Sequence, residues 1–143
     1  FLINLIKKII SEIKETGLNL FFFNIFKKDK SKKILVDEVK TAINEAIDLI
    51  DTGNNIKDTI INCYLTLIYS VKKYARESKD PSLTSREFKP ILLSLGLYSD
   101  DIDNLTYSFE RAKYSNQTIL LEEKEIVVKS LRNCIKKLKK EDL

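Results

Sequence analysis

The chain contains no histidine and no methionine, and both absences narrow what it can be. Histidine is the commonest general base and the commonest zinc ligand, so Ser-His and Cys-His nucleophile pairs and histidine metal sites are excluded. Without methionine, Phe1 is not a translational start, and we expect the chain to be a processed or excised piece of a longer protein. We also expect no metal and no cofactor.

Only two cysteines occur, Cys63 and Cys134, and neither belongs to a CxxC pair. Each stands among apolar residues, which is typical of small side chains in a core. We therefore predict two buried free thiols. A buried disulfide between the helices that carry them is the alternative.

Adjacent carboxylates are the remaining route to catalysis, and the chain has two such pairs, Asp100 with Asp101 and Glu122 with Glu123. Neighbouring residues on a helix point in different directions and do not converge on one substrate. Acidic residues near a helix N-terminus are already explained by the helix dipole. We predict no catalytic residues and a protein that is not an enzyme.

Long apolar runs and a strong charge of one sign are also missing. No run approaches the roughly 18 apolar residues that a membrane-spanning helix needs. Lys and Arg number 25 against 21 Asp and Glu, and this net charge of +4 is well short of a dedicated nucleic-acid binder. The 143 residues, 43% of them apolar, suffice for one compact domain with a sizeable core.

Glycine is scarce, and its three positions divide the chain. Gly17, Gly53 and Gly96 each follow a stretch with helical periodicity, where a left-handed residue closes a helix without a Cβ penalty. No strand pattern competes with these helices. We predict an all-α fold, a single compact bundle of five or six helices over about residues 2–16, 34–51, 56–77, 84–95, 99–114 and 121–140.

Apolar residues recur at spacings of three and four in each predicted helix. The helix at 56–77 is the most apolar, so we expect it to be central. Ser99 is the predicted N-cap of the fifth helix, with Asp100 and Asp101 in its first turn. The expected inward residues are Leu35, Val39, Ala42, Ile43, Ala46 and Ile50 in the second helix, Ile102, Leu105, Phe109 and Ala112 in the fifth, and Val127 or Val128, Leu131, Ile135 and Leu138 in the last.

Proline and a capping motif mark the short fourth helix. Pro81 breaks the preceding pattern, and TSRE at 84–87 is a capping box, in which the Thr84 hydroxyl accepts from the Glu87 amide and the Glu87 carboxylate reaches back. Pro90 lies inside this helix and removes a backbone donor, so we expect a kink or a tight first turn. The expected inward residues are Leu92, Leu93 and Leu95.

The first 33 residues have a character of their own. An apolar stripe opposite several lysines predicts an amphipathic helix. The sequence LNLFFFNIF at 18–26 fits an extended segment, a short helix or a surface-seeking aromatic patch, and the lysines of 27–33 fit a solvated linker. We divide the chain into an amphipathic, juxtamembrane-like helix with a basic linker, 1–33, and a helical C-terminal domain, 34–143. The stripe consists of Leu2, Leu5, Ile6, Ile9 and Ile13.

Two placements of this first helix are open. It packs on the bundle, with Phe21, Phe22 and Phe23 helping to turn the chain back, or it lies on an anionic membrane surface with these rings inserted and the lysines facing the lipid. We favour packing on the bundle, because a stripe of five large aliphatic residues is too large to leave in water.

Aromatic and charged side chains alternate in the segment LTYSFERAKYSNQT at 105–118; they are Tyr107, Phe109, Arg111, Lys113 and Tyr114. In one interpretation the aromatic rings pack the fifth helix against the third, and one of the two cations pairs with Glu87 at the capping box. In the other, the same groups line a shallow groove that receives a peptide or a partner helix, because Tyr and Arg are enriched in interface hot spots.

Three motifs occur in a fixed order along the chain. The first motif contains a helix break followed by an aliphatic-x-x-Tyr pattern, which Ile60, Ile61 and Tyr64 make, and its sequence is AIDLIDTGNNIKDTIINCYLTLIYSV. The second motif is LTSREF and the third is YSFERAKYS. Over about residues 34–138 these motifs resemble the helical C-terminal domain of unknown function in membrane-bound transglutaminase-like proteins. Ser85 replaces the usual Pro of the second motif and Lys113 the second Arg of the third.

The resemblance implies a location and a context. In such proteins this domain follows the last transmembrane helix and lies in the cytoplasm, while the transglutaminase-like domain lies outside. Related proteins are encoded near MoxR-type AAA ATPases, so the expected partner is such an ATPase or another domain of the parent protein. The Cys-His-Asp core of a transglutaminase is not in this chain, and Lys113 lacks the bidentate fork of Arg.

These observations together predict a non-enzymatic cytoplasmic interaction or regulatory module of a larger membrane protein of the transglutaminase-like kind. The alternative from another class is a small helical nucleic-acid-binding or transcription-associated domain, which the basic final helix would serve. That helix has no recognised motif and no interleaved aromatic platform, so we expect no nucleic acid.

Overall fold

The computed structural model describes residues 2–13, 18–77 and 88–140, with side chains for 2–9, 30–77 and 88–139. These residues form six helices and no β-strand, which confirms the all-α prediction. None of the six is both long enough and apolar enough to cross a membrane. The helices are α1 (Leu2–Ile13), α2 (Leu18–Asp51), α3 (Ile56–Glu77), α4 (Phe88–Ser94), α5 (Ser99–Tyr114) and α6 (Leu121–Lys140).

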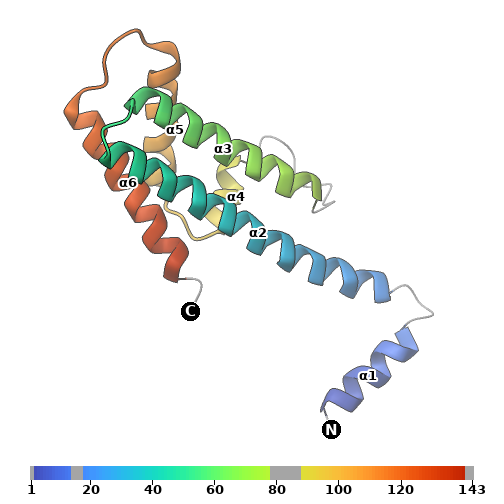
Figure 1. The fold of residues 1–143 in the computed structure, drawn as a ribbon. Coiled ribbons are helices and arrows are strands. Elements are labelled where there is room, and N and C mark those ends of the chain that lie inside the picture. The colour runs from blue at the N-terminus through green and yellow to red at the C-terminus, as the bar shows by residue number, and fades with distance from the viewer. Residues whose placement is uncertain (1, 14–17, 78–87, 141–143) are drawn as a thin grey trace.

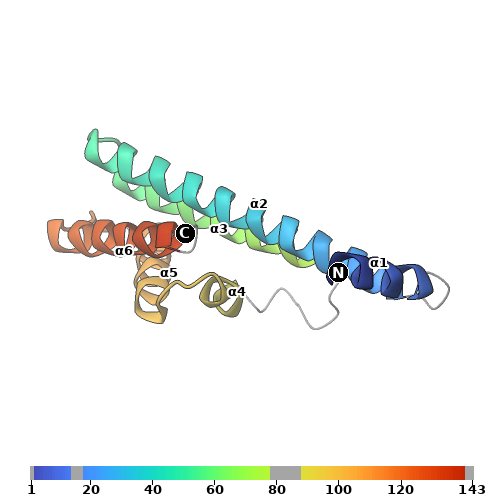
Figure 2. The same ribbon diagram turned by 90° about the horizontal axis from the view of Figure 1, so that it is seen from below.

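Four of the helices form a ring around the core. Helix α2 packs on α3 and α6, and α5 packs on the same two helices, while the short α4 contacts α3 and α5. Figure 1 shows α2 and α3 side by side. Figure 2 shows this pair as one layer, and α4, α5 and α6 all lie on one side of it. Helix α1 lies at the N-terminal end of α2, away from α5 and α6 in both views.

The core forms where the apolar stripes of the ring helices meet. All the predicted inward residues of α2 and α5 are buried, and in α6 Val127 is buried at 1% exposure while Val128 is only partly buried. Helix α3 is central, as expected, because it contacts α2, α4 and α5. Its buried apolar residues are Ile60, Cys63, Tyr64, Leu67 and Val71.

Helix α2 is much longer than expected. It begins at Leu18, so LNLFFFNIF and the lysine-rich segment 27–33 are helical, and the predicted linker is wrong, although Lys30, Lys32 and Lys33 are exposed as expected. No glycine or proline occurs between Leu18 and Thr52 to end the helix, and lysine is a good helix former. Ser31 is already buried, so the burial pattern of the bundle begins inside that segment.

Glycine ends α2 as predicted. Gly53 has a φ of 81°, and the Gly53 amide donates to the Ile50 carbonyl at 3.2 Å while the Asn54 amide donates to the Leu49 carbonyl at 3.0 Å. These two bonds form a Schellman motif, in which a left-handed residue satisfies the last carbonyls of a helix. Gly96 has a φ of 94° after α4, and Gly17 lies outside the described residues.

In the described part of the chain α4 spans Phe88–Ser94, and Pro90 lies within it. The ring of Pro90 removes one backbone donor from this helix. The inward position predicted for Leu93 is wrong, because its side chain is 40% exposed and Ile91 is buried instead. Thr84 and Glu87, the two residues of the capping box, lie outside the described residues.

The N-terminus of α5 also differs from the prediction. Tyr98 is the N-cap, without a side-chain capping bond, and Ser99 is the first helical residue, so Ser99 is not the cap. The Ile102 amide donates to the Tyr98 carbonyl at 3.2 Å, which starts the helix one residue earlier than expected. Asp100 and Asp101 do lie in the first turn, where their negative charges interact favourably with the positive end of the helix dipole.

Helix α1 does not bury its apolar stripe. Leu2 and Ile3 are 68% and 69% exposed, and Leu5, Ile6 and Ile9 are all more than 40% exposed. The prediction that this helix packs its stripe on the bundle is therefore wrong for the residues described. Among the described helices α1 packs on α2, at the N-terminal end of α2 and away from α5 and α6 (Figure 1).

Both cysteines are free and buried, which confirms the prediction of buried thiols and makes the disulfide alternative wrong. Burial raises the pKa of Cys63 to about 12, and the charge of Glu45 adds to the shift. Burial also raises the pKa of Cys134 to about 12, with additions from Asp101 and from Cys63. The Cys63 thiol donates to the Ala42 carbonyl at 3.7 Å.

We predict that both thiols react slowly in the native protein. With a pKa of about 12, only about 10⁻⁴ of each thiol is ionised at pH 8, and a thiol reagent attacks the thiolate. In about 6 M guanidinium, Ellman's reagent at pH 8 should react quickly with two thiols per chain. Without denaturant the same reaction should be at least about 100-fold slower.

The same pKa shifts set a direction for stability against pH. Above the ordinary thiol pKa of 9.0 the unfolded chain loses protons that the native chain keeps until about pH 12, so stability falls across this interval. Substitution of both cysteines by serine removes this thiol contribution and serves as the control. Rapid labelling of both native thiols would contradict the buried assignment.

Candidate interaction surface

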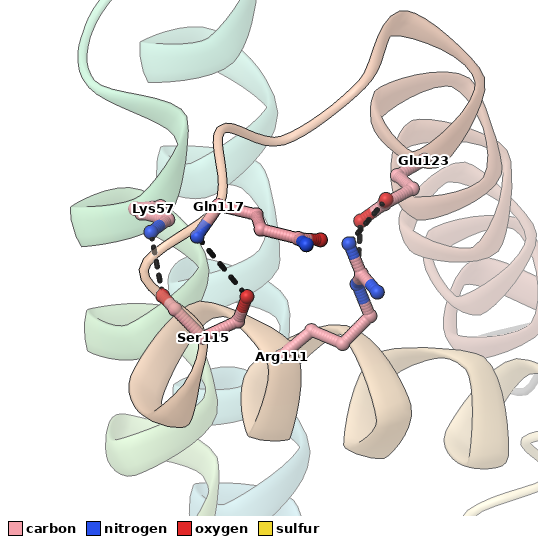
Figure 3. Close-up of polar contacts among 5 residues, drawn as sticks. All are labelled: Lys57, Arg111, Ser115, Gln117 and Glu123. Atoms are coloured by element: carbon pink, nitrogen blue, oxygen red, sulfur yellow. Dashed lines mark hydrogen bonds and ion pairs between the residues drawn. The ribbon is translucent and has the colours of Figure 1, made fainter.

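The C-terminal half of α5 is held to α6 by a forked ion pair. Arg111 Nε donates to Glu123 Oε2 at 3.0 Å, and Arg111 Nη2 donates to Glu123 Oε1 at 2.8 Å (Figure 3). Two parallel bonds of this kind require the planar fork of arginine. The negative charge of Glu123 raises the pKa of Arg111, against the effect of burial and with a contribution from Tyr107.

The loop after α5 is tied to α3 close by. Lys57 Nζ donates to the Ser115 carbonyl at 2.8 Å, which places a cation at the C-terminal end of α5, where the helix dipole favours it. The Gln117 amide donates to Ser115 Oγ at 3.1 Å, and the Gln117 side chain points toward the ion pair (Figure 3). These contacts fix the turn from α5 to α6.

One aromatic residue of the motif is a core residue. The ring of Phe109 stacks on Tyr64 of α3, with centroids 4.3 Å apart, and the ring of Phe88 is also close to Tyr64, at 5.3 Å. The Tyr64 hydroxyl shares a hydrogen bond of 2.9 Å with Thr106 Oγ1. Burial raises the pKa of Tyr64, so this hydroxyl stays protonated as a structural group. Phe109 therefore packs α5 against α3 as predicted.

The two tyrosines of the motif do not pack. Tyr107 is 60% exposed and Tyr114 is 75% exposed, so the prediction that they pack α5 against α3 is wrong. Lys113 Nζ lies 5.3 Å from the ring centre of Tyr114 and 5.6 Å from that of Phe109, distances that fit cation–π contacts. Exposed rings beside cations have the composition of an interface rather than of a core.

The predicted contact between Glu87 and Arg111 or Lys113 falls outside the described residues, as does Thr84. Among the described residues the partner of Arg111 is Glu123, which we did not predict. The feature that would have indicated this pair is the register of the α5–α6 hairpin. Its antiparallel pairing brings Asn104 to Ser130 at 3.2 Å, and the same offset brings Arg111 to Glu123.

One member of each acidic pair is engaged in a contact between helices. Asp101 is 6% exposed and accepts from Asn133 Nδ2 at 3.3 Å, and Glu123 is committed to Arg111. No three side chains suited to a metal ion come together in the part of the chain that the structure describes. The polar contacts of this region connect helices.

Comparisons with protein-family models, with curated proteins and with solved structures found no match to the chain.

We predict that the aromatic residues of the motif differ sharply in their effect on stability. Phe109→Ala should cost about 3–5 kcal/mol, because it removes a buried ring from the contact of α5 with α3. Tyr107→Ala and Tyr114→Ala should each cost less than about 1 kcal/mol, because both rings are exposed. Chemical denaturation of the three variants measures this. Similar losses in all three would contradict the assignment.

We also predict that Arg111 and Glu123 are coupled. Arg111→Lys and Glu123→Gln should each lower the melting temperature, because neither keeps both bonds of the fork, and the double variant should lose less than the sum. Lys89→Ala is the matched control, since the ion pair of Lys89 with Asp103 is far more exposed. Additive losses in the double variant would show that the two residues act separately.

Proposed function

We propose that the chain is a non-enzymatic interaction module of a larger membrane protein of the transglutaminase-like kind, and that it works at the cytoplasmic surface of the membrane. The observation that carries the proposal is the exposed apolar stripe of α1. Four large aliphatic side chains of the stripe, Leu2, Leu5, Ile6 and Ile9, are 43% to 68% exposed, and Ile3 beside them is 69% exposed. Full burial of each would contribute about 1.5–3 kcal/mol, so a surface of this size favours a partner.

The composition of the N-terminal segment supports a lipid partner for this stripe. Lys7 and Lys8 are exposed on α1, and the early part of α2 carries five lysines between residues 27 and 33. An amphipathic helix with a basic polar face is suited to lie in the head-group region of an anionic bilayer. Lysines close to a membrane anchor also fit the cytoplasmic side.

The motif resemblance supports the wider context. The motifs of 34–138 resemble a domain that follows the last transmembrane helix of transglutaminase-like proteins, and this context makes a MoxR-type AAA ATPase or another domain of the parent protein the proposed protein partner. The exposed Tyr107 and Tyr114 beside Lys113 are residue types found in such contacts.

We expect Ile6→Glu with Ile9→Glu to weaken binding of the chain to vesicles that contain phosphatidylserine at least tenfold. The reason is that two charges are placed in the apolar stripe. The stability of the chain should change by less than about 0.5 kcal/mol per site, because both side chains are exposed. Vesicle sedimentation and thermal melting measure the two effects.

Asn4→Glu with Ser11→Glu is the matched control. It adds the same charge to the same helix, on the opposite face by helical periodicity, and should weaken vesicle binding only a few-fold. Equal binding by wild type and by the Ile6→Glu, Ile9→Glu variant would contradict a role of the stripe at the membrane. So would a wild-type chain that binds no anionic vesicle.

A further inference from the structure

A groove runs along the outer side of the α2–α3 pair. It encloses about 440 Å³ and is lined by residues of these two helices alone. Ala42 and Ser70, both small and buried, form its floor, and the larger Ile34 and Tyr69 stand at its edge with 41% and 62% exposure. A second hollow continues from Glu45 to Leu49, so the depression follows α2 from residue 34 to residue 49, about 22 Å.

The edge of the groove on α2 is acidic. Asp37 and Glu45 lie about 12 Å apart along the helix, and neither forms an ion pair with a residue that the structure describes. Glu38, between them, is already occupied, because Lys73 Nζ of α3 donates to Glu38 Oε1 at 3.0 Å. Burial opposes ionisation of Glu38, but the bonds from Lys73 and Ser70 lower its pKa.

The α1 helix of the same chain does not reach this groove. Helix α1 has 12 residues and is about 18 Å long, whereas Thr41, at the middle of the groove, lies about 35 Å along α2 from Leu18. If α1 folded back along α2 it would end before Ile34. Helix α1 is therefore not the occupant of the groove.

We propose that this α2–α3 groove binds an amphipathic helix of a partner protein, one that carries two basic side chains two turns apart beside its apolar stripe. Two helices that present small side chains between them leave room for a third, in the helix-in-groove mode of recognition. The carboxylates of Asp37 and Glu45 set the charge of the partner, and their spacing of about 12 Å along α2 is close to the distance of about 10.5 Å between residues seven apart on a helix. The inference rests on the proposed role as an interaction module, and adds the chemistry of its protein partner.

The probe is a fluorescein-labelled helical peptide of about 18 residues (long enough to cover the groove at 1.5 Å per residue). It is built on alanine and leucine, with arginines at two positions seven apart. The matched peptide has glutamate at the same two positions. Fluorescence anisotropy with the full chain should show saturable binding of the arginine peptide, at least tenfold tighter than binding of the glutamate peptide.

Two variants of the chain locate the binding. Asp37→Lys with Glu45→Lys should weaken the arginine peptide at least tenfold, and Glu110→Lys with Glu125→Lys, the same charge change on exposed positions of α5 and α6, should change affinity less than about threefold. Thr41→Trp fills the groove from an exposed position and should also block the peptide, with the melting temperature of the chain unchanged.

The proposal is overturned if the arginine peptide does not bind, if both peptides bind equally, or if the reversal at Asp37 and Glu45 has no more effect than its control. Vesicle binding of the same variants separates this result from the proposed function. The groove variants should keep the vesicle affinity of the wild type, whereas the Ile6→Glu, Ile9→Glu variant should lose vesicles and keep the peptide. Loss of one activity alone therefore identifies which of the two proposals has failed.

Discussion

The fold depends on a single constraint, which is that α3 must bury two sides at once. One side packs on α2, and the other receives the Phe109 ring, which stacks on Tyr64 at 4.3 Å. A helix that is apolar on more than one face has to be central in a bundle. Because α6 then bridges α2 and α5, the ring closes without any contribution from α1. This is why the N-terminal stripe can stay exposed while the core is complete.

Local periodicity was sufficient to predict the helices of this ring and most of their buried faces. The bounds of α3 and α6 coincide with the predicted ones, and the inward residues of α2, α5 and α6 are buried, because each stripe has only one neighbouring surface to meet. Gly53 could also be predicted, since a left-handed C-terminal residue almost requires glycine. The prediction that failed was the one that took a polar composition as evidence for a linker. The lysine-rich segment 27–33 resembles a linker in composition, but lysine favours helix and nothing there stops α2.

The candidate surface was harder to predict, because it depends on tertiary register. The residues Tyr107, Phe109 and Tyr114 alternate with charges, and sequence spacing alone does not say which ring turns inward. Phe109 is three residues from Ala112 and four from Leu105, so it belongs to the buried stripe, whereas the two tyrosines lie off it. Arg111 could have been assigned to Glu123 only from the offset of the α5–α6 hairpin, which the polar contacts of Asn104 and Asp101 reveal.

The two exposed surfaces carry opposite charge, and the architecture explains why this is compatible with one fold. The lysines precede residue 34 on α2, whereas Asp37 and Glu45 of the groove follow it on the same helix. Since the helix is continuous, the charge changes sign along one axis, from the lysines of 27–33 to Asp37 and Glu45. A helix divided in this way repels an anionic surface at the groove and attracts it at the N-terminus. If the chain acts as proposed, such a gradient would direct the N-terminal lysines toward lipid and the α2–α3 groove toward a basic partner.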